Sequence, residues 1–204
     1  FTEITPMIDI YQFLKPLSEN CFRTEKCLLT VAESLKQKTS IHFIPIMTTD
    51  ARQQLESFTP AGSRPETLPT VCRVALDFKA AQLEGNKKAR SFLMALQQAL
   101  VTNNQSYSRE LVITIAKTTQ LNVPDFISNR QTKETIRAVI KEQQLAQQLM
   151  PKIQAGVAID VSTPSQTTVL TDCSAKKLVS AFTPHLTQRV TPDILLQNLS
   201  VYAH

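Results

Sequence analysis

The sequence of 204 residues predicts an α/β fold in which a small β-sheet is interrupted by a long helical region. Three observations support this. The first fifty residues alternate between strand and helix patterns, the next hundred carry apolar residues at helical spacing, and β-branched residues return after Pro151. The predicted order is therefore β-α-β, a set of helices, and β-β-α. With 42% hydrophobic residues, the chain has enough apolar side chains for a core.

The first fifty residues predict one β-α-β unit. Residues 7–13 are aliphatic and aromatic, which is typical of a short buried strand that Pro16 ends. Residues 19–37 repeat apolar positions at helical period, and residues 40–47 form a second apolar run. Two strands joined through a helix favour a parallel pair.

The middle of the chain predicts helices only. Residues 48–65 are polar and contain Pro60, Gly62 and Pro65, so we expect a loop there. Amphipathic spacing then predicts helices over residues 66–84, 87–102, 109–120, 124–128 and 131–149. Pro151 ends the last of them.

The end of the chain predicts a hairpin and a helix. We expect a connector over 156–164, a strand over 166–171 and a partner strand over 177–182, with the turn between them. Thr191 is a good N-cap with Pro192 at the first helical position, so a final helix begins there.

Composition excludes several classes of function. Only three glycines are present, and no Gly-rich phosphate loop exists. The net charge of +5 comes from scattered basic residues without Trp, so we expect no nucleic-acid partner. No apolar run reaches ~18 residues, which predicts no membrane span. The histidines and cysteines lack metal-ligand spacing, so no metal is expected. The four cysteines form no dense framework, which favours a reducing cytoplasm.

Three segments together resemble one family. They are Pro16-Leu17-Ser18-Glu19-Asn20-Cys21, the insert segment over 75–85, and Thr163-Pro164-Ser165. The chain resembles the DsbA-like branch of the thioredoxin superfamily across nearly its whole length. Within it, the chain is most similar to the cytosolic dithiol-disulfide isomerase-like proteins and the YjbH-type adaptors. Those adaptors deliver a redox-stress transcription regulator to a Clp-type protease.

The resemblance implies a fold and a site. It implies a thioredoxin-like core over residues 1–65 and 151–204, with an α-helical insertion over 66–150. The active-site positions would be Ser18 and Cys21. The binding surface for a protein partner or a thiol or disulfide substrate would include Pro16, Leu17, Glu19 and Asn20, with Thr163 and Pro164 as the cis-proline loop.

The sequence departs from the family pattern at Ser18, where the attacking cysteine should be. In a Cys-x-x-Cys site at a helix N-terminus, the helix lowers the pKa of the first thiol, and its thiolate attacks a disulfide. A serine hydroxyl ionises far above neutral pH, so the normal dithiol cycle is impossible. Gln12, six residues earlier, occupies a position where these enzymes often have an acidic proton acceptor, and an amide cannot accept that proton.

Three functions remain open at this point. The first is a binding or adaptor module with a degenerate Ser18-x-x-Cys21 site, for which no cofactor is expected. The second is an active thiol-disulfide oxidoreductase in which Ser18 is an engineered replacement of cysteine. The third is a glutathione-dependent transferase that uses Ser18 to hold the glutathione thiolate. Of long-range cysteine pairings we considered Cys21 with Cys173, but the sequence gives no distance between them.

Overall fold

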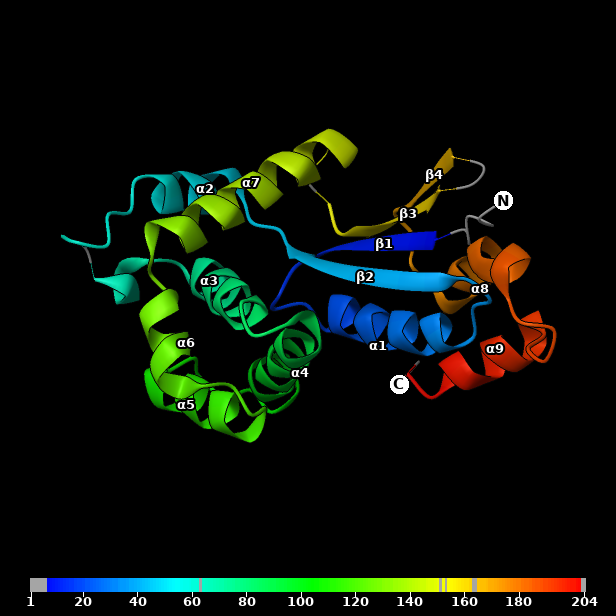
Figure 1. Cartoon of the computed structure of the whole chain (residues 1–204), viewed down its shortest axis with the longest axis horizontal. Coiled ribbons are helices and arrows are strands. Elements are labelled where there is room, and N and C mark those ends of the chain that lie inside the picture. Colours follow the sequence, from blue (N-terminus) through cyan, green and yellow to red (C-terminus); the bar gives the residue numbers. More distant parts are fainter. Residues whose placement is uncertain (1–6, 63, 151, 153, 163–164, 203–204) are drawn as a thin grey trace, which may run out of the picture. The chain divides into compact units, whose positions relative to one another are not determined.

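The computed structural model describes residues 7–62, 64–150, 152, 154–162 and 165–202 (Figure 1). Its strands are β1 (Met7–Leu14), β2 (Lys38–Pro45), β3 (Gly156–Ser162) and β4 (Ser165–Leu170). Its α-helices are α1 (Glu19–Glu33), α2 (Thr49–Glu56), α3 (Thr70–Gln82), α4 (Asn86–Gln97), α5 (Arg109–Thr118), α6 (Val123–Asn129), α7 (Lys133–Leu149), α8 (Ala175–Phe182) and α9 (Pro192–Ser200). Short turns of other helix types are η1 (Pro65–Thr67), η2 (Gln98–Thr102) and η3 (Thr183–His185).

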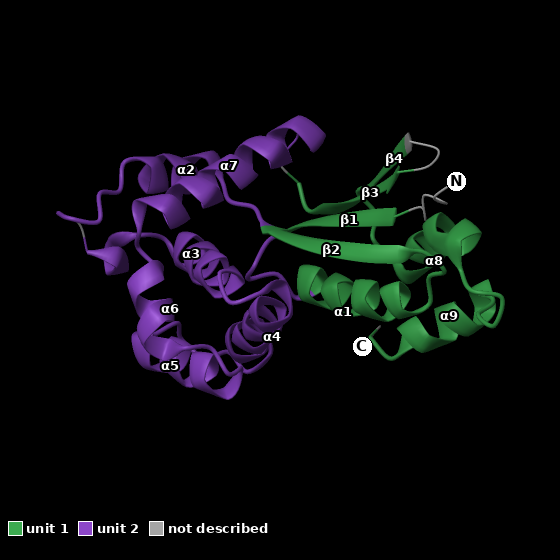
Figure 2. Ribbon diagram, in the orientation of Figure 1, with its two compact units in different colours: residues 1–14, 20–44, 154–204 green, residues 15–19, 45–153 purple. Residues whose placement is uncertain are grey.

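The chain divides into two compact units (Figure 2). The first holds the sheet with α1, α8 and α9, and it consists of residues 1–14, 20–44 and 154–204. The second holds the helices from α2 to α7 and includes the short segment 15–19. The helix α1 therefore begins at the point where the chain passes from one unit to the other.

The sheet has the strand order β2-β1-β3-β4. The strand β3 runs antiparallel to β1 with Gln12 opposite Val157, and antiparallel to β4 with Val157 opposite Leu170. Alternate residues of β1 and β3, such as Ile10 and Ile159, share a core with residues of α1, α8 and α9. This alternation follows from the two-residue period of a strand, which places every second side chain on the same face.

The predicted β-α-β unit, helical region and C-terminal pair of strands are confirmed, but that pair lies one element earlier than predicted and two α-helices follow it. The residues predicted as a connector form β3, and those predicted as a second strand lie in α8. In α8, Leu178, Val179 and Phe182 are buried, which is the spacing of one helical face. Glycine and alanine at the start of β3 hid a strand whose residues from Gly156 to Ile159 are all buried.

The predicted loop over 48–65 is wrong in its first part, because α2 forms there. Thr48 caps this helix, since its side chain accepts a hydrogen bond from the backbone N–H of Ala51. Ala51 and Leu55, four residues apart, are buried with residues of α3 and α7 such as Cys72 and Val139. The helix depends on this packing, which local composition does not reveal.

A buried polar cluster in the second unit joins α3 to the residues that precede α5 and follow α6. Asp77 on α3 is only 1% exposed, and its carboxylate accepts hydrogen bonds from Arg130 Nε at 2.5 Å and from the Tyr107 hydroxyl at 2.6 Å. Arg130 also donates to the Tyr107 oxygen at 2.9 Å, and the Arg73 guanidinium lies over the Tyr107 ring. Burial and the nearby Asp77 carboxylate raise the pKa of Tyr107, so the phenol stays protonated and remains a donor.

We predict that Tyr107→Phe lowers the free energy of unfolding by about 1–3 kcal/mol, because it leaves the buried Asp77 carboxylate without one of its donors. Urea denaturation followed by circular dichroism measures the change. Tyr202→Phe is the matched control, since the Tyr202 hydroxyl pairs with a partly buried Thr30 hydroxyl and supports no buried charge. Equal losses in the two variants would contradict a special role for the cluster.

Candidate functional site

A tight turn connects β1 to α1 and carries the first predicted site residues. The backbone N–H of Ser18 donates to the carbonyl of Lys15 at 3.0 Å, and Pro16 and Leu17 occupy the two central positions of the turn. Proline suits the first of these because its ring fixes φ at the required value. Ser18 directly precedes α1 and therefore stands at the N-cap position, where a thiol would receive the field of the helix dipole.

Cys21 lies in the first turn of α1 and is buried, with 6% of its surface exposed. Gln12 on β1 supports this turn from below, because its Nε2 donates to the carbonyl of Cys21 at 3.0 Å. Gln12 is itself 1% exposed, and its Oε1 atom is buried without a hydrogen-bond partner among the described residues. The amide at this position therefore positions the helix and cannot take up a proton from a thiol.

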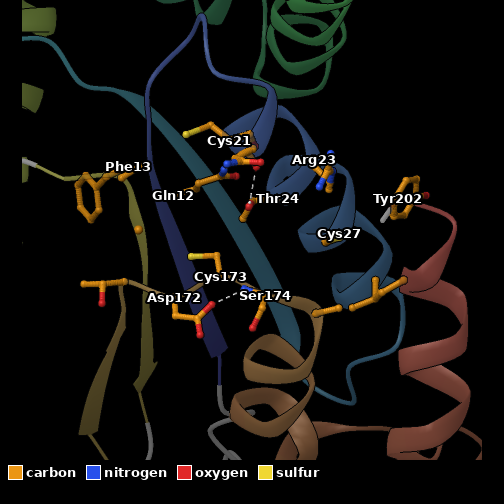
Figure 3. A pocket seen from close by; sticks show the side chains of 16 residues that line it. Gln12, Phe13, Cys21, Arg23, Thr24, Cys27, Asp172, Cys173, Ser174 and Tyr202 are labelled. Atoms are coloured by element: carbon orange, nitrogen blue, oxygen red, sulfur yellow. Dashed lines mark hydrogen bonds between the residues drawn. The ribbon is translucent and has the colours of Figure 1, made fainter. Parts of the chain in front are cut away.

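A cavity of about 440 Å³ opens beside this turn within the sheet-bearing unit (Figure 3). Asn20 and Cys21 line it from α1, Ala155 and Gly156 from the start of β3, and Cys173 from the turn after β4. Sequence spacing alone gives no distance between Cys173 and Cys21. The signal that would have located Cys173 is the β3–β4 register, which returns the chain to the end of β1 where Gln12 lies.

An apolar groove of about 290 Å³ lies within the helical unit. Pro16 and Leu17 line it together with Ile46, Met47 and Val71, and Lys15 and Thr48 are its polar members. Leu17 is 48% exposed, whereas Met47 is 5% exposed, so the groove has a buried floor and an open apolar rim. An exposed leucine beside a hollow of this kind can receive an apolar side chain from another molecule.

Thr163 and Pro164, the predicted cis-proline loop, lie outside the described residues. The residues on either side, Ser162 and Ser165, face each other in the β3–β4 register. The Ser162 hydroxyl accepts from the backbone N–H of Met7, at the start of β1 rather than at its end. The strand residue next to the end of β1 is Gly156, which pairs with Phe13. The roles predicted for residues 163 and 164 therefore stay predictions.

Glu19 and Asn20 are exposed in the first turn of α1, and Glu19 belongs to the helical unit by contact. Cys27 and Cys72 are buried among apolar side chains, and burial raises the pKa of both thiols, that of Cys72 to about 11.

Within the described ranges, no three His, Cys, Asp or Glu side chains are arranged to hold a metal ion. No helix in those ranges is long and apolar enough to cross a bilayer.

Solved structures share this fold over almost the whole chain. A putative protein disulfide isomerase from Nitrosomonas europaea matches with a TM-score of 0.59 and 12% identity, covering 97% of this chain and 98% of its own. The cytosolic disulfide reductase DsbM from Pseudomonas aeruginosa matches with a TM-score of 0.59 and 14% identity, covering 96% and 98%. A cysteine-to-serine variant of DsbA from Proteus mirabilis, solved with a non-covalently bound peptide, matches with a TM-score of 0.52 and 13% identity, covering 94% and 88%.

One curated relative is the ClpXP adapter protein SpxH from Bacillus licheniformis. It is 24% identical over 152 residues, which cover 65% of this chain and 51% of the relative, so the chain spans about half the length of that protein. The family model described as thioredoxin matches residues 11–176, which include the second half of β1, the turn with Ser18, α1, the helical unit and both C-terminal strands. This match shows that the chain belongs to the thioredoxin family, and its fold is shared with DsbA-like structures.

Proposed function

We propose that this chain is a protein-binding module of the DsbA-like family whose dithiol site is degenerate. The observation that carries the proposal is the apolar groove beside Ser18, lined by Pro16, Leu17 and Val71. The residues of the turn remain as a binding surface, whereas the thiol that would attack a bound disulfide is absent from position 18. Binding without exchange is the chemistry that these residues support.

The shape and lining of the groove suit an extended peptide with an apolar side chain. Leu17 stands at the rim and Met47 at the floor, so an entering side chain would be surrounded by apolar atoms. Burying a leucine-sized side chain contributes about 1.5–3 kcal/mol. That energy corresponds to about a tenfold to hundredfold change in the dissociation constant, which is enough for one groove to select its partner.

Position 18 argues against catalysis by the dithiol cycle. The cycle needs a thiolate at the helix N-terminus and a second thiol to resolve the mixed disulfide. A helix dipole contributes about 0.3–1 kcal/mol, which is far too little to ionise a serine hydroxyl near neutral pH. Gln12, whose amide contacts the Cys21 carbonyl, does not titrate and so provides no proton acceptor there. Two independent positions thus lack what the exchange reaction requires.

The similarity to SpxH supports an adaptor role. We propose that the chain acts in the cytoplasm and presents a bound protein to a Clp-type protease during redox stress. The bound peptide in the DsbA serine variant shows that a protein with this fold can hold a peptide without a covalent bond. The helical unit, which contains the groove, would then be the part that recognises the partner.

We predict that Leu17→Glu weakens peptide binding at least tenfold, because it places a charge on the apolar rim of the groove. A phage-displayed library of random extended peptides is selected on the unmodified chain, and dissociation constants are measured by fluorescence anisotropy. Leu83→Glu is the matched control, since Leu83 is 64% exposed, belongs to the same unit and does not line the groove. Equal affinities of Leu17→Glu and the unmodified chain would refute the groove as the binding site.

A second prediction concerns exchange chemistry. The unmodified chain should not reduce insulin disulfides with dithiothreitol as electron donor, because position 18 has no thiol. Ser18→Cys should be weakly active, and Ser18→Cys combined with Gln12→Glu should be faster, since the carboxylate restores a proton acceptor below Cys21. Full activity of Ser18→Cys alone would contradict a site that has lost both functions.

A further inference from the structure

The cavity of the sheet-bearing unit is lined by two thiols, the remaining cysteine of the degenerate motif and one from outside the motif. Cys21 reaches it from the first turn of α1, and Cys173 reaches it from the turn that follows β4. In Figure 3 the side chain of Gln12 lies between these two cysteines. The two residues are 152 positions apart in sequence, so only the fold brings them to the same cavity.

Hydrogen bonds and strand register place both cysteines close to Gln12. Gln12 Nε2 donates to the Cys21 carbonyl at 3.0 Å, and Gln12 is the register partner of Val157. The Cys173 thiol accepts a hydrogen bond from the backbone N–H of Val157 and lies 3.7 Å from the carbonyl of Leu170, which is opposite Val157 on β4. One cysteine therefore contacts Gln12 directly, and the other contacts its neighbour across the strand.

The cavity is polar enough to admit a small reagent. Polar side chains, those of Asn20, Thr24 and Ser174, line it together with Gln12. Its volume of about 440 Å³ has room for water or a small polar molecule. Cys173 is partly exposed, whereas the other three cysteines are buried, so it is the thiol that a reagent meets first.

We propose that Cys21 and Cys173 form a redox pair that closes to a disulfide when the chain meets a low-molecular-weight disulfide. The Cys173 thiolate attacks one sulfur of the reagent, which forms a mixed disulfide and releases one small thiolate. The Cys21 thiolate then attacks the Cys173 sulfur, which forms the protein disulfide and releases the second small thiolate. Two protein thiols lose two protons and two electrons, and the reagent is reduced to two thiols.

The electrostatics of the cavity set the speed of this reaction. Burial, together with the neighbouring Cys21 thiolate and Asp172 carboxylate, raises the pKa of the Cys173 thiol to about 11. The other titratable or charged side chains that line the cavity are Arg23, Cys27 and Tyr202. Because only the thiolate attacks, the first step should be slow at neutral pH and should accelerate about tenfold per pH unit below the pKa.

The test uses the full chain and hydroxyethyl disulfide as the reagent. After reaction at pH 7, 8 and 9, remaining thiols are alkylated and the digested chain is analysed by mass spectrometry. We expect a linked Cys21–Cys173 peptide whose rate of formation rises about tenfold per pH unit. A stable hydroxyethyl adduct on Cys173 with Cys21 still reduced would overturn the proposal, as would a lack of reaction at both residues.

Cys72 is a control within the same molecule. Burial raises its pKa to about 11, the same as Cys173, but it is 0% exposed and its thiol lies 3.3 Å from the Ala51 carbonyl. It should remain reduced throughout, and reaction of Cys72 at the rate of Cys173 would show unfolding rather than a redox pair. Cys21→Ser should leave the hydroxyethyl adduct on Cys173. This result does not depend on peptide binding to the groove, so each proposal can fail alone.

Discussion

The antiparallel pairing of β1 with β3 is the constraint on which the candidate site depends. It sets Gln12 opposite Val157 and Phe13 opposite Gly156, so the start of β3 lies beside the end of β1. From that position Gln12 bonds the Cys21 carbonyl and holds the first turn of α1 over the sheet. A shift of the register by one residue would turn Gln12 to the other face and remove this support.

Each of the two units contains its own candidate site. The helical unit contains the apolar groove with Pro16 and Leu17, which offers a surface for binding. The sheet-bearing unit contains Cys21, Gln12 and Cys173 around a cavity, which offers thiol chemistry. Ser18 precedes α1 where the chain passes from one unit to the other. Without a thiol at position 18, the dithiol cycle of a Cys-x-x-Cys site is not possible there.

Local sequence predicted the elements whose signals lie within a few consecutive residues. Hydrophobic period and capping residues are signals of this kind, and they predicted β1, α4 and the start of α9 correctly. The elements β3, α2 and α8 were missed because their state depends on distant partners. In α8, eight residues with Leu178 and Phe182 fit a strand or a helix until the core face of the sheet selects the helix.

The candidate site was predictable only where it follows the chain. Residues 16–21 are consecutive, so the motif located the turn and the helix start correctly. Cys173 and Gly156 reach the cavity through strand register, and Val71 reaches the groove through packing of α3, which sequence spacing alone does not specify. The predicted proline loop, Thr163 and Pro164, lies outside the described residues and stays a prediction.

The most direct test of binding through the groove is a nuclear magnetic resonance titration of the isotope-labelled chain with a selected peptide. Binding in the groove predicts shifts centred on the amides of Leu17, Met47 and Val71, all of which line it. The amides of Gly156 and Cys173, which line the separate cavity, should change little. Shifts centred on those two residues, with Leu17 unaffected, would contradict the account and place binding at the thiol cavity instead.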